Sequence, residues 1–232
     1  LKDTHFVNCT GLDDAPEAAE HLTTAHDLAV ISRELLKHKE IKKYTTIWMD
    51  TVRGGRFGLA NTNKLVRFYS GTTGLKTGYT SAAGHCLSAT ALRDGIELIA
   101  VVLHCKSSPE RFESAKALLN YGFANYGVYT PSVDTAELTP VKVLRGVERT
   151  VNPQIGELSP LLIKKGQEKN ITQTLELAQD LEAPVLENQV IGKLTLSLDG
   201  QTVAQYEVHA AKPVKRLGFG GALARLFAAL IA

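Results

Sequence analysis

The residue types best suited to chemistry lie together in the tripeptide Lys76-Thr77-Gly78, which begins a predicted strand and is framed by glycines on both sides. The lysine ammonium is a cation and the threonine hydroxyl is a donor, so together they can hold an anionic group. The glycine keeps the strand surface clear for a substrate backbone. On its own, however, such a tripeptide more often marks a solvated lysine beside a glycine turn, so the surrounding elements must decide.

The composition excludes several classes of protein. The chain has 232 residues, a formal net charge of +2 and 44% hydrophobic residues, which is typical of one or two ordinary globular domains. The near-neutral charge gives no reason to expect a nucleic-acid partner. The three cysteines lack CxxC spacing and the histidines form no HExxH motif, so we expect no disulfide framework, no metal site and no cofactor.

A helix is predicted over residues 25–38, ahead of the tripeptide. Thr24 is a plausible N-cap because Asp27 follows three residues later. Apolar residues then recur at helical spacing and predict one buried stripe, formed by Leu28, Ile31 and Leu35. Residues 44–70 mix β-forming residues with Gly54-Gly55 and predict short strands joined by turns.

A β-hairpin is predicted directly after the tripeptide. The apolar runs Gly84–Leu92 and Ile96–Leu103 are separated by Arg93-Asp94-Gly95, in which Asp-Gly is a strong hairpin signal. The second run is almost continuously apolar, as expected for a strand that is covered on both faces. We therefore expect it to lie centrally in a sheet.

A second helix should begin at Ser107, with Glu110 three residues later, and should end near Gly122. The apolar residues that it directs inward are Phe112, Ala115 and Leu119. Arg111 is expected to be a surface charge on this helix; the alternative is a basic residue near the candidate site. A helix, a hairpin and a helix in this order indicate an α/β layered unit.

The pattern changes beyond Tyr129 to short alternating runs that Gly, Pro and Asp turns separate. The last two runs flank Asp199-Gly200, a second hairpin signal. Such a series predicts a small all-β sandwich. Its expected strands are Val141–Leu144, Leu161–Ile163, Thr174–Leu177, Leu194–Leu198 and Val203–Val208. We place three parts at residues 1–132, 133–211 and 212–232.

The segment from Gly74 to Thr80, together with Ala83-Gly84, resembles the penicillin-binding D-alanyl-D-alanine carboxypeptidases of low molecular mass and serine type. The resemblance covers nearly the whole chain. It implies an α+β protein with three parts: the distal half of a β-lactamase/transpeptidase-like α/β domain, a small all-β sandwich domain and a C-terminal amphipathic helix.

The resemblance also implies serine acyl transfer on peptidoglycan stem peptides, a reaction that β-lactam antibiotics intercept. Lys76 and Thr77 would hold the terminal carboxylate of the substrate. Gly78 would leave room for the peptide to pair as an added strand, and the backbone N–H of Tyr79 would be one oxyanion donor. These four residues are the expected substrate-binding site.

A catalytic nucleophile is absent from the sequence. The family requires a Ser-x-x-Lys motif and a Ser-x-Asn motif ahead of Lys-Thr-Gly. No serine here is followed three positions later by lysine, and none begins a Ser-x-Asn motif; Thr73 with Lys76 and Thr139 with Lys142 have the spacing but the wrong nucleophile. We therefore expect a piece that begins after the second motif and is inactive when isolated.

The C-terminal tail is expected to lie on the outer face of the bacterial cytoplasmic membrane. Its basic cluster is Lys212, Lys215 and Arg216, and its apolar stripe is Leu223, Leu226, Phe227 and Leu230. Residues 217–232 are too few to span a bilayer and are interrupted by Arg225. The alternative is a helix docked on the β domain.

Two other functions fit parts of the sequence. A non-catalytic, membrane-tethered module could keep the Lys-Thr-Gly wall and the β domain only to contact the cell wall. A serine β-lactamase shares the Lys-Thr-Gly wall, but the β domain and the amphipathic tail count against it.

Overall fold

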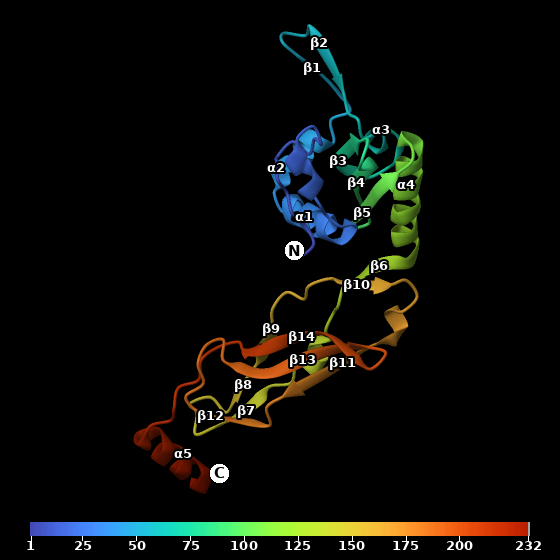
Figure 1. Ribbon diagram of the computed structural model, residues 1–232. Helices are drawn as coiled ribbons and strands as arrows, with labels where there is room; N and C mark the ends of the chain where they lie inside the picture. Colours follow the sequence, from blue (N-terminus) through green and yellow to red (C-terminus); the bar gives the residue numbers. More distant parts are fainter. Residues whose placement is uncertain (232) are drawn as a thin grey trace. The chain divides into compact units, whose positions relative to one another are not determined.

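The computed structural model describes residues 1–231 and divides the chain into two units, Leu1–Gly127 and Val128–Ala232 (Figure 1). Ala232, the last residue of the predicted tail, lies outside the described residues. Each unit has its own hydrophobic core. The mixture of helices and sheets, with a β unit and a C-terminal helix, confirms the predicted fold class.

The elements of the first unit are, in chain order, η1 (Pro16–Glu20), α1 (Ala25–Leu36), α2 (Lys39–Thr45), β1 (Met49–Val52), β2 (Phe57–Ala60), α3 (Leu65–Phe68), β3 (Thr72–Thr80), β4 (Gly84–Arg93), β5 (Ile96–Cys105) and α4 (Ser108–Asn125). The strand β6 (Tyr126–Tyr129) follows at the junction of the units.

An antiparallel sheet of order β3-β4-β5 carries the candidate site, and helices cover both of its faces (Figure 1). Successive side chains of a strand point to opposite faces. Leu87 and Ala89 of β4 join the core with residues of α4, whereas the hydroxyl of Ser88 lies 2.7 Å from that of Ser32 in α1. The helices α1 and α4 therefore pack on opposite faces of the sheet.

The first helix begins as predicted but buries a different face. Thr24 accepts a hydrogen bond from the backbone N–H of Asp27 (3.1 Å), which confirms the N-cap. Leu35 is 39% exposed, so the predicted apolar stripe is wrong at its end. The buried residues of α1 are Asp27 and Ser32. Their burial is tolerated because each is hydrogen-bonded to a hydroxyl of the same unit, that of Thr4 and that of Ser88 respectively.

The region 44–70 contains the predicted short strands but also two helices that the sequence did not indicate. Tyr44 and Thr45 end α2 and do not begin a strand. The hydroxyls of Thr45 and Thr46 donate to carbonyls one turn earlier in the chain, at 3.2 and 2.6 Å, so both side chains are bonded to the backbone of α2 at its C-terminal end.

The hairpin β4–β5 confirms the Asp-Gly turn, since Asp94 and Gly95 both have positive φ, 48° and 78°. The expected position of β5 is wrong within the described residues, because β5 lies at one end of the order β3-β4-β5. Both α1 and α4 contact β5, so cover by helices accounts for its apolar run.

The helix α4 has the predicted N-cap and buried face. Ser107 accepts a hydrogen bond from the backbone N–H of Glu110 (3.3 Å), and the three predicted apolar residues are buried. The helix continues past Gly122 to Asn125. Gly122 does not stop the helix; it permits close packing, because a Cβ there would overlap the side chain of Leu98 in β5.

The core of the second unit lies between two sheets. One has the order β11-β13-β14-β9 and the other β12-β7-β8. The five predicted runs fall on strands, and Asp199 and Gly200 form the second hairpin with positive φ. The elements are η2 (Thr135–Glu137), β7 (Val141–Leu144), β8 (Thr150–Val151), β9 (Pro153–Ile155), β10 (Leu161–Lys164), η3 (Glu168–Asn170), β11 (Ile171–Leu177), β12 (Asp180–Glu182), β13 (Val190–Leu198), β14 (Gln201–Ala210) and α5 (Phe219–Ile231).

Candidate functional site

The Lys-Thr-Gly tripeptide lies on β3, which is a terminal strand of its sheet. Within the described residues β3 pairs with β4 alone, so its other edge is open. Lys76 and Gly78 are exposed and Thr77 is buried. No atom lies within 4 Å of a Cβ built on Gly78, so the glycine borders open space.

A cavity of about 430 Å³ adjoins the tripeptide. Three of the four predicted substrate-binding residues line it, whereas Tyr79 does not. The other lining residues come from the N-terminal segment, the start of α1 and the strands β4 and β5: Phe6, Asn8, Cys9, Thr10, Gly11, His21, Thr23, Leu28, Cys86, Leu87, Ser88 and Leu103. The cavity therefore joins the Lys-Thr-Gly strand to the first residues of the chain.

The segment before α3 fixes β3 in place. The hydroxyl oxygens of Thr62 and Thr77 lie 2.6 Å apart. The buried amide of Asn63 donates to the carbonyl of Gly74 at 3.0 Å. The sequence suggested only a turn here, although a run of three hydrogen-bonding side chains beside a strand is a signal of such contacts.

Lys76 directs its ammonium along its own strand, where it donates to the carbonyl of Thr77. The charge and the Thr77 hydroxyl thus belong to adjacent residues of one cavity wall. A carboxylate that entered the cavity could accept hydrogen bonds from both groups.

Arg111 corrects a prediction, because it is only 7% exposed and is not a surface charge. Its Nη1 donates to the carbonyls of Gly78 (3.1 Å) and Cys86 (3.4 Å), which face each other across β3 and β4. Burial lowers the pKa of the guanidinium. The sequence did contain a signal of this burial, because Arg111 is next to Phe112 on the buried face of α4.

The side chain of Tyr79 packs on β4, outside the cavity. Its ring centroid lies 4.3 Å from that of His85, with the planes inclined by 30°. The two residues are direct partners across β3 and β4. This places the tyrosine ring at the end of the Lys-Thr-Gly strand.

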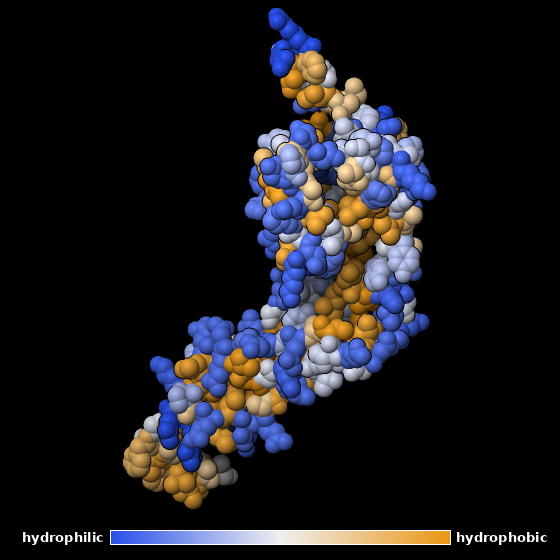
Figure 2. Space-filling view, viewed as in Figure 1, coloured by the Kyte–Doolittle hydropathy of each residue, from blue (hydrophilic) through white to orange (hydrophobic). Residues whose placement is uncertain are grey.

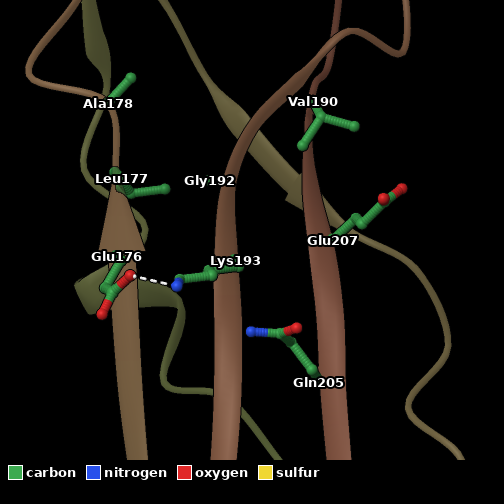
Figure 3. A pocket seen from close by; sticks show the side chains of 8 residues that line it. All are labelled: Glu176, Leu177, Ala178, Val190, Gly192, Lys193, Gln205 and Glu207. Carbon is green, nitrogen blue, oxygen red and sulfur yellow. Dashed lines mark ion pairs between the residues drawn. The ribbon is translucent and has the colours of Figure 1, made fainter.

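A larger hollow, of about 760 Å³, lies on the β11-β13-β14 sheet of the second unit (Figure 3). Its centre is a row of facing residues, Glu176, Lys193 and Glu207, with an ion pair of 2.9 Å between the first two. All three side chains are exposed. We assign the candidate site to the smaller cavity, because only that one contains the Lys-Thr-Gly tripeptide. Within residues 1–231, no group of three His, Cys, Asp or Glu side chains could hold a metal ion.

Each of the two units matches a known protein family. Residues 1–107 match the family model for D-alanyl-D-alanine carboxypeptidase, and residues 130–216 match the model for the C-terminal domain of penicillin-binding protein 5. The chain is therefore similar to D-alanyl-D-alanine carboxypeptidases over both of its units. This confirms the resemblance that the sequence suggested.

Individual relatives agree with this assignment. A D-alanyl-D-alanine carboxypeptidase of Bacillus subtilis is 33% identical over 94% of this chain and 56% of its own length. One of Escherichia coli is 30% identical over 95% of this chain and 54% of its own length. The chain thus spans about half the length of these curated relatives. Penicillin-binding protein 5 of Haemophilus influenzae is a structural neighbour, with a TM-score of 0.67, 29% identity and cover of 93% of this chain and 62% of its own.

The C-terminal helix α5 presents an apolar surface. Its exposed apolar residues are Phe219, Leu223, Leu226, Phe227 and Leu230. The guanidinium of Arg225 donates to the carbonyls of Gly146 (3.1 Å) and Val147 within the same unit. Among the described residues, none of the helices has the length and hydropathy needed to cross a bilayer.

Proposed function

We propose that the chain binds the substrate of a D-alanyl-D-alanine carboxypeptidase reaction and forms one wall of the active site. In this reaction a serine oxygen attacks the carbonyl between two terminal D-alanines, the second D-alanine leaves with its amine protonated, and water then releases the acyl group. No serine of this sequence has a lysine one helical turn away, so the proposed role is to bind the stem peptide. The observation that carries the proposal is the cavity that Lys76, Thr77 and Gly78 line together.

Each residue of the tripeptide has a separate role in the proposal. Lys76 and Thr77 bind the terminal carboxylate, the first by charge and the second by a hydrogen bond. The open edge of β3 accepts the peptide as an added strand, and the open space at Gly78 admits it. The backbone N–H of Tyr79 donates a hydrogen bond to the developing oxyanion. A β-lactam carboxylate would bind in the same place.

The test is binding of N-acetyl-D-alanyl-D-alanine to the 232-residue chain, followed by amide shifts in NMR spectra. We expect shifts along residues 76–79. Lys76→Ala should weaken binding by roughly 10- to 100-fold, because a charge-assisted hydrogen bond contributes about 1.5 to 3 kcal/mol. Lys76→Arg should restore part of the affinity. The matched control is the C-terminal amide of the same dipeptide, which lacks the carboxylate. If the acid and the amide bound equally well, Lys76 and Thr77 would not be the residues that bind the carboxylate.

We further propose that α5 rests on the surface of an anionic membrane, at the outer face of the bacterial cytoplasmic membrane. Residues 223, 226, 227 and 230 fall at i, i+3, i+4 and i+7, so they share one helix face. Arg225 lies on the other side of the helix and binds carbonyls of the β unit. Polar contacts thus attach the helix while its apolar face stays exposed, which favours a lipid surface over docking on the β unit.

Co-sedimentation with anionic vesicles tests this second proposal. The paired change Leu226→Asp and Phe227→Asp should abolish pelleting, since each buried apolar side chain contributes about 1.5 to 3 kcal/mol. The exposed basic residues Lys212, Lys215 and Arg216 should make binding depend on anionic lipid. Zwitterionic vesicles are the control. Equal pelleting of parent and variant would exclude the anchor.

A further inference from the structure

The hairpin β1–β2 extends away from the rest of the first unit (Figure 1). Its strands pair only with each other within the described residues, and every residue of both strands is exposed. An isolated two-stranded hairpin is marginally stable in water, and additional packing normally supports one. Packing of another protein surface against the hairpin would therefore stabilise it.

One face of the hairpin is apolar. Residues that face each other across antiparallel strands share a face, and the pairs Val52–Phe57 and Asp50–Leu59 lie on the same one. Three of these side chains are large and apolar, with exposed fractions of 40% for Val52, 56% for Phe57 and 46% for Leu59. Figure 2 shows hydrophobic residues on the hairpin beneath a hydrophilic tip. We call these four residues the hairpin face.

Charge is distributed unevenly along this face. Asp50 lies at the end nearest the body of the unit, and the turn at the far end carries Arg53 and Arg56. The guanidinium of Arg53 stands 6.0 Å from the centre of the Phe57 ring. From base to tip the hairpin face thus has Asp50 beside Leu59, then the apolar pair Val52–Phe57, and then the two arginines of the turn.

This order is complementary to itself under a two-fold rotation. When two hairpins stack face to face and antiparallel, the tip arginines of each lie over the Asp50 of the other, and the apolar patches meet at the centre. We propose that the hairpin face binds the same face of a second copy of this chain. The acid and the bases set the antiparallel orientation, and burial of Val52, Phe57 and Leu59 drives association.

A membrane fits this surface less well, because the arginines occupy the tip and would have to enter the bilayer ahead of the apolar residues. The face is small compared with stable interfaces, so the dimer should be weak. We expect a dissociation constant on the order of 10⁻⁴ M, which corresponds to a weak but specific contact.

Sedimentation equilibrium of the full chain, at concentrations up to about 1 mM, measures this association. Phe57→Asp should weaken it by roughly tenfold or more. Leu118→Asp, at an exposed apolar residue of α4, is the matched control and should leave the association unchanged. If Phe57→Asp associates like the parent, the proposal is wrong.

A charge exchange tests the antiparallel geometry without removing apolar residues. Asp50→Arg alone and the pair Arg53→Glu with Arg56→Glu should each weaken self-association, since each creates like charges at both contacts. A mixture of the two variants should associate like the parent, because both contacts are then of opposite charge. A mixture that stays monomeric, or Phe57-dependent pelleting with anionic vesicles in place of dimers, would overturn the proposal.

Discussion

The hydroxyl of Thr77 on the Lys-Thr-Gly strand lies 2.6 Å from the hydroxyl of Thr62, in the segment before α3. Thr77 is 7% exposed, whereas Thr62 is open to solvent. If Thr77 is to donate its proton to a carboxylate, it must accept the proton of Thr62. The pair therefore links the position of the segment to the chemistry of the cavity.

Thr62→Val should destabilise the first unit by about 1 kcal/mol, because the buried Thr77 hydroxyl loses its partner. Urea unfolding followed by the fluorescence of the single tryptophan, Trp48, measures the change. Thr62→Ser keeps the hydroxyl and should resemble the parent. Thr51→Val is a control at an exposed threonine of the same unit. Equal stability of Thr62→Val and Thr62→Ser would show that the hydroxyl pair has no energetic role.

Arg111→Met should destabilise the first unit by about 1.5 to 3 kcal/mol, the range for hydrogen bonds from charged groups. The guanidinium joins the carbonyls of Gly78 and Cys86, and methionine keeps only the packing of the stem. Arg111→Lys should fall between the two, since one ammonium cannot reproduce the planar fork. Exposed Arg33→Met is the control. Hydrogen exchange at residues 76–80 should accelerate in Arg111→Met, and unchanged exchange there would contradict the bridging role.

The stability of the first unit should decrease in acid partly through Asp27. Donation by the Thr4 hydroxyl at 2.7 Å is the largest cause that lowers the pKa of this carboxyl, and the backbone N–H of Asp3 adds to it. A folded pKa below the unfolded value of about 3.9 means that this contribution is complete above that pH. It is lost as the pH falls through the folded pKa.

Asp27→Asn should therefore reduce the difference in urea midpoint between about pH 6 and pH 2, because the variant has no carboxylate to protonate. Thr4→Val should reduce the same difference, since it removes the main donor. The exposed Asp13→Asn is the control. An unchanged midpoint difference in Asp27→Asn would assign the acid sensitivity to other groups.

Local signals predicted much of this fold. The caps at Thr24 and Ser107 and the turns at Asp94-Gly95 and Asp199-Gly200 each depend on a few adjacent residues, and the structure has all four. The Lys-Thr-Gly strand was predicted for the same reason, because its glycine frame is contiguous in the sequence.

The errors came from contacts between residues far apart in the chain. The polar face of α1 is buried because Asp27 and Ser32 meet Thr4 and Ser88, which a search for an apolar stripe cannot find. Arg111 was expected at the surface, but its partners are main-chain carbonyls of β3 and β4. A sequence pattern cannot identify such partners, because every residue has a carbonyl. The Thr62–Thr77 contact was missed because it too joins residues far apart in the chain.

Close packing in the second unit gives a last prediction. A Cβ on Gly192 of β13 would overlap the backbone oxygen of Glu176 and the side chain of Leu177, both in β11 (Figure 3). A backbone atom cannot move aside as a flexible side chain can, so Gly192→Ala should destabilise the second unit by roughly 1 to 3 kcal/mol.

Hydrogen exchange of the β11 and β13 amides measures this change, because Trp48 reports on the first unit. Gly156→Ala is the matched control in the same unit, since a Cβ there meets no atom within 4 Å. We expect faster exchange along β11–β13 in Gly192→Ala and parent-like exchange in Gly156→Ala. Parent-like exchange in both variants would mean that β13 can shift away from β11 at little cost, and the approach of the two strands would then not be what requires glycine at position 192.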